Sequence, residues 1–346
     1  MPTPSTDLSS SPQRILIVRL SALGDLVFCT SLLDGLRRAY PDAQISWLAQ
    51  SGFAGILRED PRIDQLISVP KSDLSSLSAL WRLRRKLRAQ RFDWVIDAQG
   101  LAKSRILAWL AGGRRRVGFR SKEPLAGLLH QTYDKGGEPS DIASEYRYLA
   151  EQLTGAPAAA PRLPITSGSR DSVDTQMQRL SLEPGFVALC PFTTRPQKHW
   201  FDDHWQTLAG LIAEAGLGRC VVFGGPADRT HAQALVEAMP AGSLSLAGDT
   251  ALHELPAWLE RAGLVIGVDT GLTHIGIAVQ RPTVALFGST CPYTGGADSP
   301  LRVLYDALPC APCKRRPTCD GAFICMRQLT PPRVIAAARE LLGAVA

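Results

Sequence analysis

Short apolar runs rich in β-branched residues recur along the chain, and each leads into a segment in which apolar residues return every three to four positions. The first run, residues 14–20, ends in a turn of small residues before a helical pattern. Such a succession predicts a strand, a loop and a helix. Further strands are predicted at 44–49, 65–69 and 93–97, and helices at 74–89 and 104–111. Strands that alternate with helices form a parallel sheet covered on both faces.

A Pro- and Ala-rich segment at 155–164 interrupts this alternation, because it suits neither a helix interior nor a central strand. After it, strands are predicted at 185–190, 219–223, 264–268 and 283–287, and helices at 203–215, 228–238, 252–261 and 271–279. We therefore expect an α/β protein with two Rossmann-like, doubly wound domains whose carboxyl strand ends face a shared cleft. The predicted parts are a disordered tail at 1–13, an N-terminal domain at 14–160, a C-terminal domain at 170–330 and a closing helix at 331–346.

The chain has 346 residues, of which 45% are hydrophobic and 20% charged, and this length allows more than one core. The Ser- and Pro-rich start has neither the basic cluster nor the apolar core of a secretory signal. No apolar run approaches the ~18 residues that a bilayer span needs. We expect a cytoplasmic protein, bound at most to a membrane surface.

The net charge of +6 comes entirely from the first 160 residues. Its densest pieces are 82–88 and Arg114–Arg116, a pattern that suits phosphate-rich surfaces. The first cluster fits a solvated helix face equally well. Arg114, Arg115 and Arg116 are the candidates for contact with an anionic acceptor. The excess is modest and lacks a basic-aromatic motif, so no nucleic-acid partner is expected.

The loop after the first strand contains one glycine, Gly24, where a dinucleotide fingerprint needs three. This argues against an NAD or FAD enzyme. Asp25 follows at the start of the predicted helix, where it would face the cleft. It could also be an N-cap that accepts a hydrogen bond from a free backbone N–H.

The loop at 191–200 combines two hydroxyls, Thr193 and Thr194, with the ammonium of Lys198. Hydroxyls and a compact cation are suited to a diphosphate whose charge grows as it leaves. A basic surface loop is the alternative.

A second phosphate-suited loop, 267–274, joins a predicted strand to a predicted helix, whose start exposes free backbone N–H groups. Its candidate binding residues are Asp269, Thr270, Gly271 and His274. Asp269 or Thr270 could instead be a cap, and His274 a core residue. Asp228 follows another strand, where it could accept hydrogen bonds from ribose hydroxyls.

Four of the eight cysteines lie close together near the C-terminus. The cluster consists of Cys310, Cys313, Cys319 and Cys325. Four thiols could close a tetrahedral zinc site in a reducing cytosol. The spacing is not that of a standard zinc finger, and the surrounding prolines favour a compact surface loop.

Taken in order, three motifs resemble those of the bacterial ADP-heptose:lipopolysaccharide heptosyltransferases, glycosyltransferase family 9. They are Ile15–Asp25 with its S-x-L-G-D turn, the loop from Thr193 to Trp200, and Asp269–His274. The tail ending in Cys325-Met326 is also similar to that of several members. The resemblance covers nearly the whole chain and implies two Rossmann domains of the GT-B type.

For the chemistry, the resemblance implies an inverting, metal-independent transfer of L-glycero-D-manno-heptose from ADP-heptose, without a cofactor. Asp25 would be the general base, Lys198 and the two threonines the phosphate contacts, and 269–274 the loop for the donor sugar and diphosphate. Asp228 would contact ribose. The acceptor would be Kdo-lipid A or heptosylated inner core, reached at the inner face of the cytoplasmic membrane.

Two other functions remain open. A family relative could use another nucleotide sugar or acceptor, because donor loops recognise phosphate before sugar. A nucleotide-sugar-binding protein without turnover would bind donor and transfer nothing, but the presence of both Asp25 and Lys198 argues against it.

Overall fold

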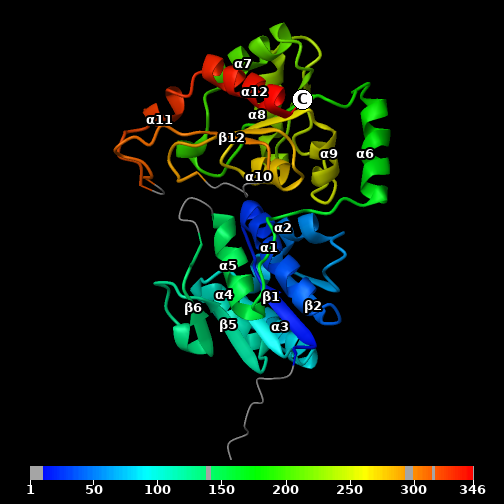
Figure 1. Cartoon of the computed structure of the whole chain (residues 1–346), viewed down its shortest axis with the longest axis vertical. Coiled ribbons are helices and arrows are strands. Elements are labelled where there is room, and N and C mark those ends of the chain that lie inside the picture. Colours follow the sequence, from blue (N-terminus) through cyan, green and yellow to red (C-terminus); the bar gives the residue numbers. More distant parts are fainter. Residues whose placement is uncertain (1–10, 138–141, 293–298, 314–315, 346) are drawn as a thin grey trace, which may run out of the picture. The chain divides into compact units, whose positions relative to one another are not determined.

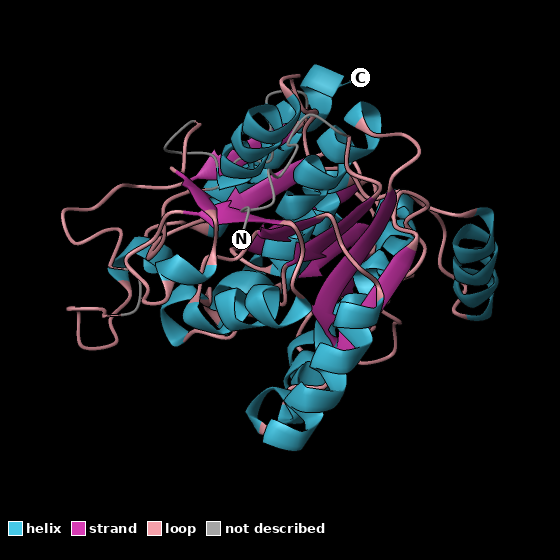
Figure 2. Ribbon diagram, turned by 90° about the horizontal axis from the view of Figure 1, so that it is seen from below, coloured by secondary structure: helices cyan, strands magenta, loops and turns pink. Residues whose placement is uncertain are grey.

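The computed structural model describes residues 11–137, 142–292, 299–313 and 316–345. The chain divides into two compact units that meet in sequence between Pro161 and Arg162. Each unit contains one parallel six-stranded sheet with helices on both faces (Figures 1 and 2). Most of the predicted tail, residues 1–10, lies outside the described residues. Gln13, the last residue of the predicted tail, is ordered against the first sheet. Its backbone N–H donates to Asp93 (2.9 Å), and its carbonyl accepts from the backbone N–H of Gln44 (2.7 Å).

The first unit has the strand order β3-β2-β1-β4-β5-β6. Its strands are β1 (Arg14–Val18), β2 (Gln44–Gln50), β3 (Gln65–Val69), β4 (Trp94–Asp97), β5 (Arg115–Phe119) and β6 (Gln131–Tyr133). Its helices are α1 (Leu23–Ala39), α2 (Ser51–Ala54), α3 (Leu77–Ala89), α4 (Ala102–Ala111) and α5 (Ile142–Thr154), with 3-10 turns at Gly55–Leu57, Ser72–Ser75 and Ala126–Leu128. This is the order of a dinucleotide-type doubly wound sheet.

The second unit has the order β12-β11-β10-β7-β8-β9, which is the same arrangement when strands are counted from β7. Its strands are β7 (Val187–Cys190), β8 (Cys220–Val222), β9 (Leu244–Ser245), β10 (Leu264–Val268), β11 (Thr283–Leu286) and β12 (Leu301–Leu304). Its helices are α6 (Ser167–Arg179), α7 (Asp202–Glu214), α8 (Arg229–Glu237), α9 (Leu255–Arg261), α10 (Gly271–Ala278), α11 (Ile324–Arg327) and α12 (Pro331–Val345), with 3-10 turns at Pro196–Lys198 and Pro226–Asp228. The closing helix α12 packs on α7.

The central strands are buried along nearly their whole length, as expected for a sheet with helices on both faces. In each sheet the chain moves first to one side of its opening strand and then to the other. The switch points therefore lie between β1 and β4 and between β7 and β10. Ligands of open α/β sheets bind at such points, beyond the carboxyl ends of the strands. Among the helices of the described ranges, none is long and apolar enough to cross a bilayer.

Several strands of the two sheets are absent from the sequence prediction. They are β5, β6, β9 and β12. β5 begins with two arginines, so it has no apolar run at its start, and the other three are short strands at the sheet edges. Edge strands receive little of the burial that produces a hydrophobic pattern.

Candidate functional site

Asp25 lies in the first turn of α1, beyond the carboxyl end of β1. Its Oδ2 accepts from Nη2 of Arg19 at 2.6 Å and from the backbone N–H of Ala22 at 3.0 Å. The side chain is 35% exposed. Asp25 therefore does help to cap its helix, but it also forms an ion pair and keeps a surface open to solvent.

Arg19, the partner of Asp25, is buried directly after β1. Its Nη1 donates to the carbonyl of Ala98 at 3.2 Å, and its guanidinium lies 5.8 Å from the ring centre of Tyr146. Burial alone would lower the pKa of this guanidinium, but interactions with Tyr146, Asp25 and Cys29 outweigh it, and the pKa lies above its ordinary value. A permanently charged buried arginine fixes the Asp25 carboxylate.

The loop after β4 lies across the switch point from Asp25. Asp97, fully buried at the end of β4, accepts backbone N–H groups of Gln99 (3.1 Å) and Gly100 (3.0 Å). The Gln99 side-chain oxygen in turn accepts from the N–H of Leu20 at 3.0 Å. Burial raises the pKa of Asp97. These contacts hold the two loops at the switch point together.

The sequence analysis missed Arg19, Asp97 and Gln99. Their position in the sequence could have indicated them, because each stands at or just after the end of a predicted central strand. Charged or amide side chains there require a hydrogen-bond partner when the strand is buried.

The structure does not bring Arg114, Arg115 and Arg116 together with Asp25. Arg115 is paired with Trp94 at the amino end of β4. The triplet therefore lies at the amino edge of the sheet, whereas Asp25 lies at the carboxyl edge. The two edges are one strand length apart, at about 3.3 Å per residue. The side chains of Arg115 and Arg116 already have partners. Arg115 donates to the Tyr133 hydroxyl at 2.7 Å and lies 4.8 Å from the ring centre of Trp94.

The remaining contacts of the triplet are also within the unit. Arg116 donates to the carbonyl of Leu128 at 2.8 Å. Arg114 is 79% exposed and lies 3.7 Å from Asp93. These positions are explained by packing and surface charge.

In the second unit, Asp269 is the centre of a buried polar cluster at the end of β10. Its carboxylate contacts the ammonium of Lys198, accepts from the Thr290 hydroxyl at 2.6 Å and from Nε2 of His274 at 3.3 Å. Burial alone would raise the pKa of Asp269, but the His274 hydrogen bond and the charges of His274 and Lys198 outweigh it. The pKa lies well below its ordinary value, so the carboxylate stays charged.

The cluster joins two loops that the sequence analysis treated separately, since Lys198 follows β7 and Asp269 follows β10. These are the strands on either side of the switch point. Thr290, which follows β11, was not predicted. Its hydroxyl is the third partner of the carboxylate, and a buried threonine after a buried strand is the feature that could have indicated it.

The other residues of the first predicted loop surround this cluster. The Thr193 hydroxyl reaches the carbonyl of Asp269 at 3.5 Å, a weak contact, and the Thr193 carbonyl lies 2.8 Å from Nε2 of His199. Thr194 is exposed. The Thr193 hydroxyl thus contacts the residue that pairs with Lys198, whereas Thr194 is open to solvent.

The second loop forms the start of α10. Thr270 is the N-cap residue, yet its side chain does not cap the helix, and Gly271 is the first helical residue. A side chain at Gly267 would collide with Thr273 and Cys190, so glycine lets β10 and α10 pack closely. The free N–H groups of this helix start lie next to the Lys198–Asp269 pair.

Asp228 lies after β8, which is the neighbour of β7. Its Oδ2 accepts from the backbone N–H of Gly225 at 2.8 Å and so closes its own turn. The carboxylate is half-buried. Contact with a ribose stays a prediction.

The four clustered cysteines line one small cavity of about 60 Å³, in part against Gly288 and Ser289. Burial raises the pKa of Cys313 and of Cys325. All four are free thiols. Within the described ranges, no group of three His, Cys, Asp or Glu side chains is arranged to hold a metal ion.

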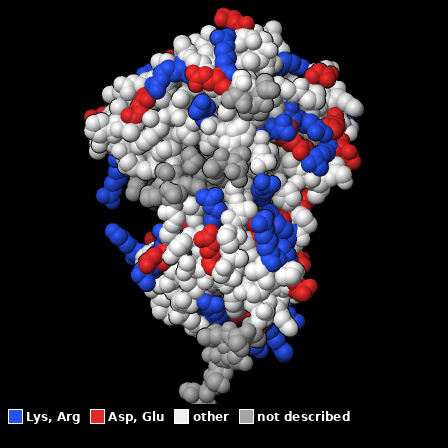
Figure 3. All heavy atoms as spheres, in the orientation of Figure 1, with Lys and Arg blue, Asp and Glu red and all other residues white. Residues whose placement is uncertain are grey.

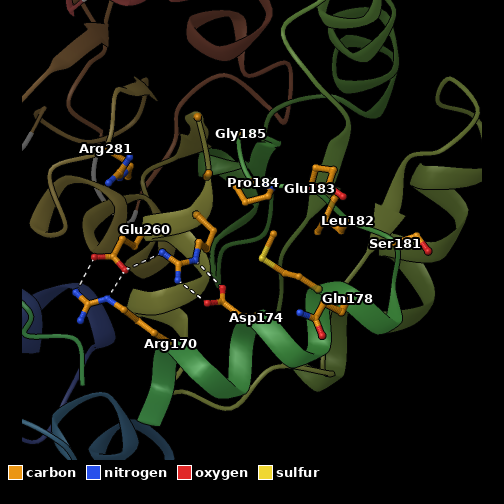
Figure 4. Close-up of a pocket in the computed structure, with 14 residues that line it drawn as sticks. Arg170, Asp174, Gln178, Ser181, Leu182, Glu183, Pro184, Gly185, Glu260 and Arg281 are labelled. Carbon is orange, nitrogen blue, oxygen red and sulfur yellow. Dashed lines mark hydrogen bonds and ion pairs between the residues drawn. The ribbon is translucent and has the colours of Figure 1, made fainter. Parts of the chain in front are cut away.

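A hollow of about 910 Å³ in the second unit lies between α6 and α9 (Figure 4). Arg170 pairs with both oxygens of Glu260 at 2.8 Å, and Arg261 with both oxygens of Asp174 at 2.7 Å. The hydrogen bond from Arg170 lowers the pKa of Glu260. Because these charges satisfy one another, and because the hollow borders the amino end of β7, we assign it to the packing of α6.

Comparisons with known proteins identify the family. The model of glycosyltransferase family 9 (heptosyltransferase) matches residues 80–322. Lipopolysaccharide heptosyltransferase 1 of Pseudomonas aeruginosa is 32% identical over 88% of this chain and 87% of its own length. The Escherichia coli K12 protein of the same name is 28% identical over 81% and 89%.

Solved structures agree with this result. An E. coli heptosyltransferase, WaaC, determined with ADP-2-deoxy-2-fluoro heptose, is 27% identical and superposes with a TM-score of 0.70 over 96% of this chain and 100% of its own. The two Rossmann-like units are thus those of the GT-B heptosyltransferase structures. The chain belongs to glycosyltransferase family 9, the heptosyltransferases, and is a glycosyltransferase.

Proposed function

We propose that this enzyme transfers L-glycero-D-manno-heptose from ADP-heptose to the inner core of lipopolysaccharide, with inversion at the anomeric carbon. The names of its relatives support the acceptor, and the ligand of the E. coli structure supports the donor. The observation that carries the proposal is the cluster of Lys198, Asp269 and the start of α10, because it gathers cationic and N–H groups at a ligand-binding switch point.

Asp25 is the general base in this proposal. An acceptor hydroxyl attacks the anomeric carbon on the face opposite the diphosphate and gives its proton to the Asp25 carboxylate. Arg19 holds Oδ2 of a carboxylate that is 35% exposed, so Oδ1 would be the atom that takes the proton. A new C–O bond forms, the bond to the diphosphate breaks, and its electron pair leaves with ADP.

The second unit stabilises that leaving group. Charge grows on the diphosphate as the bond breaks, so the Lys198 ammonium, the Thr193 and Thr194 hydroxyls and the N–H groups near Gly271 act more strongly in the transition state than before it. Asp269 fixes Lys198 and prevents it from turning away. Asp228, in the turn after β8, would contact the ribose.

The acceptor binds, in our proposal, at the carboxyl edge of the first sheet, at the inner surface of the cytoplasmic membrane. Lys103, in the first turn of α4, and Arg120 and Lys122, after β5, are exposed there. Arg120 also pairs with Asp134 at 3.0 Å, but both side chains of that pair remain largely exposed. Kdo carboxylates and lipid A phosphates would meet these cations. Since Arg114–Arg116 lie at the other edge, we transfer the acceptor role from that triplet to these three residues.

A donor panel tests the proposal. Purified enzyme is incubated with Kdo-lipid A or with heptosylated inner core as acceptor, and with ADP-heptose, a GDP-sugar or a UDP-sugar as donor. Nucleotide release, product mass and the anomeric configuration of the product are measured. Release of ADP with a heptosylated product of opposite anomeric configuration is expected. Turnover with another nucleotide sugar would identify a relative of different specificity. Donor binding without any release would indicate a binding protein.

A further inference from the structure

Exposed large apolar side chains are concentrated in one part of the first unit. Of the eight such side chains in the described ranges, six lie within residues 77–125. They are Leu77, Trp81, Leu101, Ile106, Trp109 and Leu125. Single exposed apolar residues are ordinary, but six that share two helices and one adjoining turn indicate a contact surface.

Helix α3 presents the most exposed of them. Its inner face, with Leu83 and Leu87, packs on the core of the unit. Leu77 and Trp81 are one helical turn apart on the outer face and are 78% and 66% exposed. Neither contributes to the core, so the fold itself does not require an apolar residue at either position.

The polar residues of these two helices are almost all basic. Helices α3 and α4 contain no Asp or Glu. The exposed or half-exposed cations on them are Arg82, Arg84, Arg85, Lys86, Arg88 and Lys103. The guanidinium of Arg84 lies 5.1 Å from the ring centre of Trp81. On the face drawn in Figure 3, basic and acidic side chains are interspersed, so two adjacent helices without an acid are distinctive. The acid beside them is the exposed Glu123, which accepts from the backbone N–H of Ala102 at the start of α4 (3.4 Å).

The two helices lie side by side on one face of the sheet. Arg88, near the end of α3, donates to the carbonyls of Leu110 (3.0 Å) and Trp109 (3.3 Å) at the end of α4. Both helices follow right-handed crossovers in the same direction along the sheet. Their amino ends, with Leu77 and Lys103, therefore stand at the carboxyl edge of the strands, the edge that also holds Asp25. Trp81 lies one turn further along α3, and Trp109 lies near the other end of α4.

We infer that the outer face of α3 and α4 is a docking surface for an anionic lipid bilayer. Indole rings favour the interface between headgroups and acyl chains, and arginine and lysine are attracted to anionic headgroups. The proposed function explains the benefit, because a lipid-linked acceptor would be brought to Asp25, but binding to the bilayer itself does not depend on it. A protein partner would have to match a predominantly basic face with exposed tryptophans.

Vesicle cosedimentation tests this inference. Full-length protein is mixed with vesicles of phosphatidylethanolamine and phosphatidylglycerol, or of phosphatidylcholine alone, at low and high salt. We expect binding to the anionic vesicles only, and weaker binding at high salt because the attraction is screened. Equal binding to neutral vesicles, or none to anionic ones, would overturn the inference.

Two variants separate the charges from the apolar residues. R82Q/R85Q/K86Q should bind anionic vesicles about 100-fold more weakly. L77S/W81S should bind anionic vesicles about tenfold more weakly at both salt concentrations, because the apolar contribution is not screened. A matched control in the second unit, R179Q/L180S/R302Q/R339Q, changes exposed residues of the same kinds. It should bind like the unaltered protein, and losses in the control equal to those of the two variants would show that binding does not depend on α3 and α4, which would overturn the inference.

Two further measurements test whether a second copy of the chain covers this surface and whether vesicle binding is independent of the transferase activity. Sedimentation velocity that shows a dimer dissociated by L77S/W81S, with no vesicle binding, would assign the surface to a second copy and overturn the inference. Turnover with a lipid-free Kdo oligosaccharide should be unchanged in all variants. If the unaltered protein binds vesicles but transfers nothing to either acceptor, the proposed function fails and the docking surface stands.

Discussion

The ammonium of Lys198 lies directly against the carboxylate of Asp269, although the two residues follow different strands of the second sheet. Both are largely buried, with side chains 15% and 6% exposed. A buried ion pair contributes little net stability, but removing one partner is costly because the other charge is left unpaired. The pair therefore serves to position a cation at the switch point, and the following predictions depend on it and on Asp25.

The variant Asp25→Asn should lower kcat by about 10²- to 10⁴-fold, because it removes the base, while donor affinity is retained. Steady-state kinetics measure kcat, and calorimetry measures the affinity for the donor. Asp34→Asn is the matched control, because Asp34 lies on the same helix and its ion pairs, to Arg38 and Arg62, are likewise lost on neutralisation. Near-normal turnover in Asp25→Asn would reduce Asp25 to a cap and a partner of Arg19.

Lys198→Ala should weaken donor binding by about 10- to 100-fold, the value of a charge-assisted hydrogen bond, and should also lower kcat. Calorimetry with ADP and steady-state kinetics give both numbers. The control is Arg229→Ala, which removes an exposed cation paired with Asp249 in the same unit. If Lys198→Ala binds ADP normally and turns over normally, the diphosphate site lies elsewhere.

Thr290→Val keeps the side-chain shape but removes the hydrogen bond to Asp269. We expect the free energy of unfolding to fall by about 1–3 kcal/mol, and donor affinity to fall as the Lys198–Asp269 pair loosens. Thr283→Val is the control, because Thr283 is equally buried and donates to the carbonyl of Arg281 instead. It should lose stability without losing affinity. Equal affinity losses would mean that Thr290 acts only through stability.

Asp269 should contribute to acid lability. Its pKa in the folded chain is depressed below the ordinary 3.8, so its contribution is fully present above that value and is lost as pH falls toward the folded pKa. The difference in unfolding free energy between the unaltered protein and Asp269→Asn should be constant from pH 7 to about 5 and shrink below about 4. Denaturant titrations at each pH measure it. A difference that stays constant down to pH 3 would contradict the depressed pKa.

Neutralising the cations of the carboxyl edge with K103Q/R120Q/K122Q should raise the acceptor KM about tenfold and leave the donor KM nearly unchanged. Added salt should mimic the change, since exposed charges more than about 8–10 Å apart are screened near physiological ionic strength. The charge-matched control, R14Q/R91Q/R114Q, lies at the amino edge. If the control raises the acceptor KM instead, the acceptor site belongs with the arginine triplet after all.

Much of the architecture was predictable because burial leaves a local pattern. The runs at 14–20 and 264–268 are apolar throughout because helices cover both faces of their sheets, and the loops that follow a strand can be located once the strand is. Hence Asp25, Lys198 and Asp269 could be named as candidates from the sequence. Strands such as β5 and β9 could not, because a charged start or an edge position removes the pattern.

The sequence by itself determined the fold class, the family and the residues that stand at strand ends. The tertiary structure decided which of them meet. Strand order brings Lys198 to Asp269 across β7 and β10, and register places Arg115 beside Trp94 at the edge away from Asp25. Local periodicity specifies whether a residue is buried, but the partner of a buried charge depends on the order in which strands assemble. That order is set by crossovers and packing over the whole sheet.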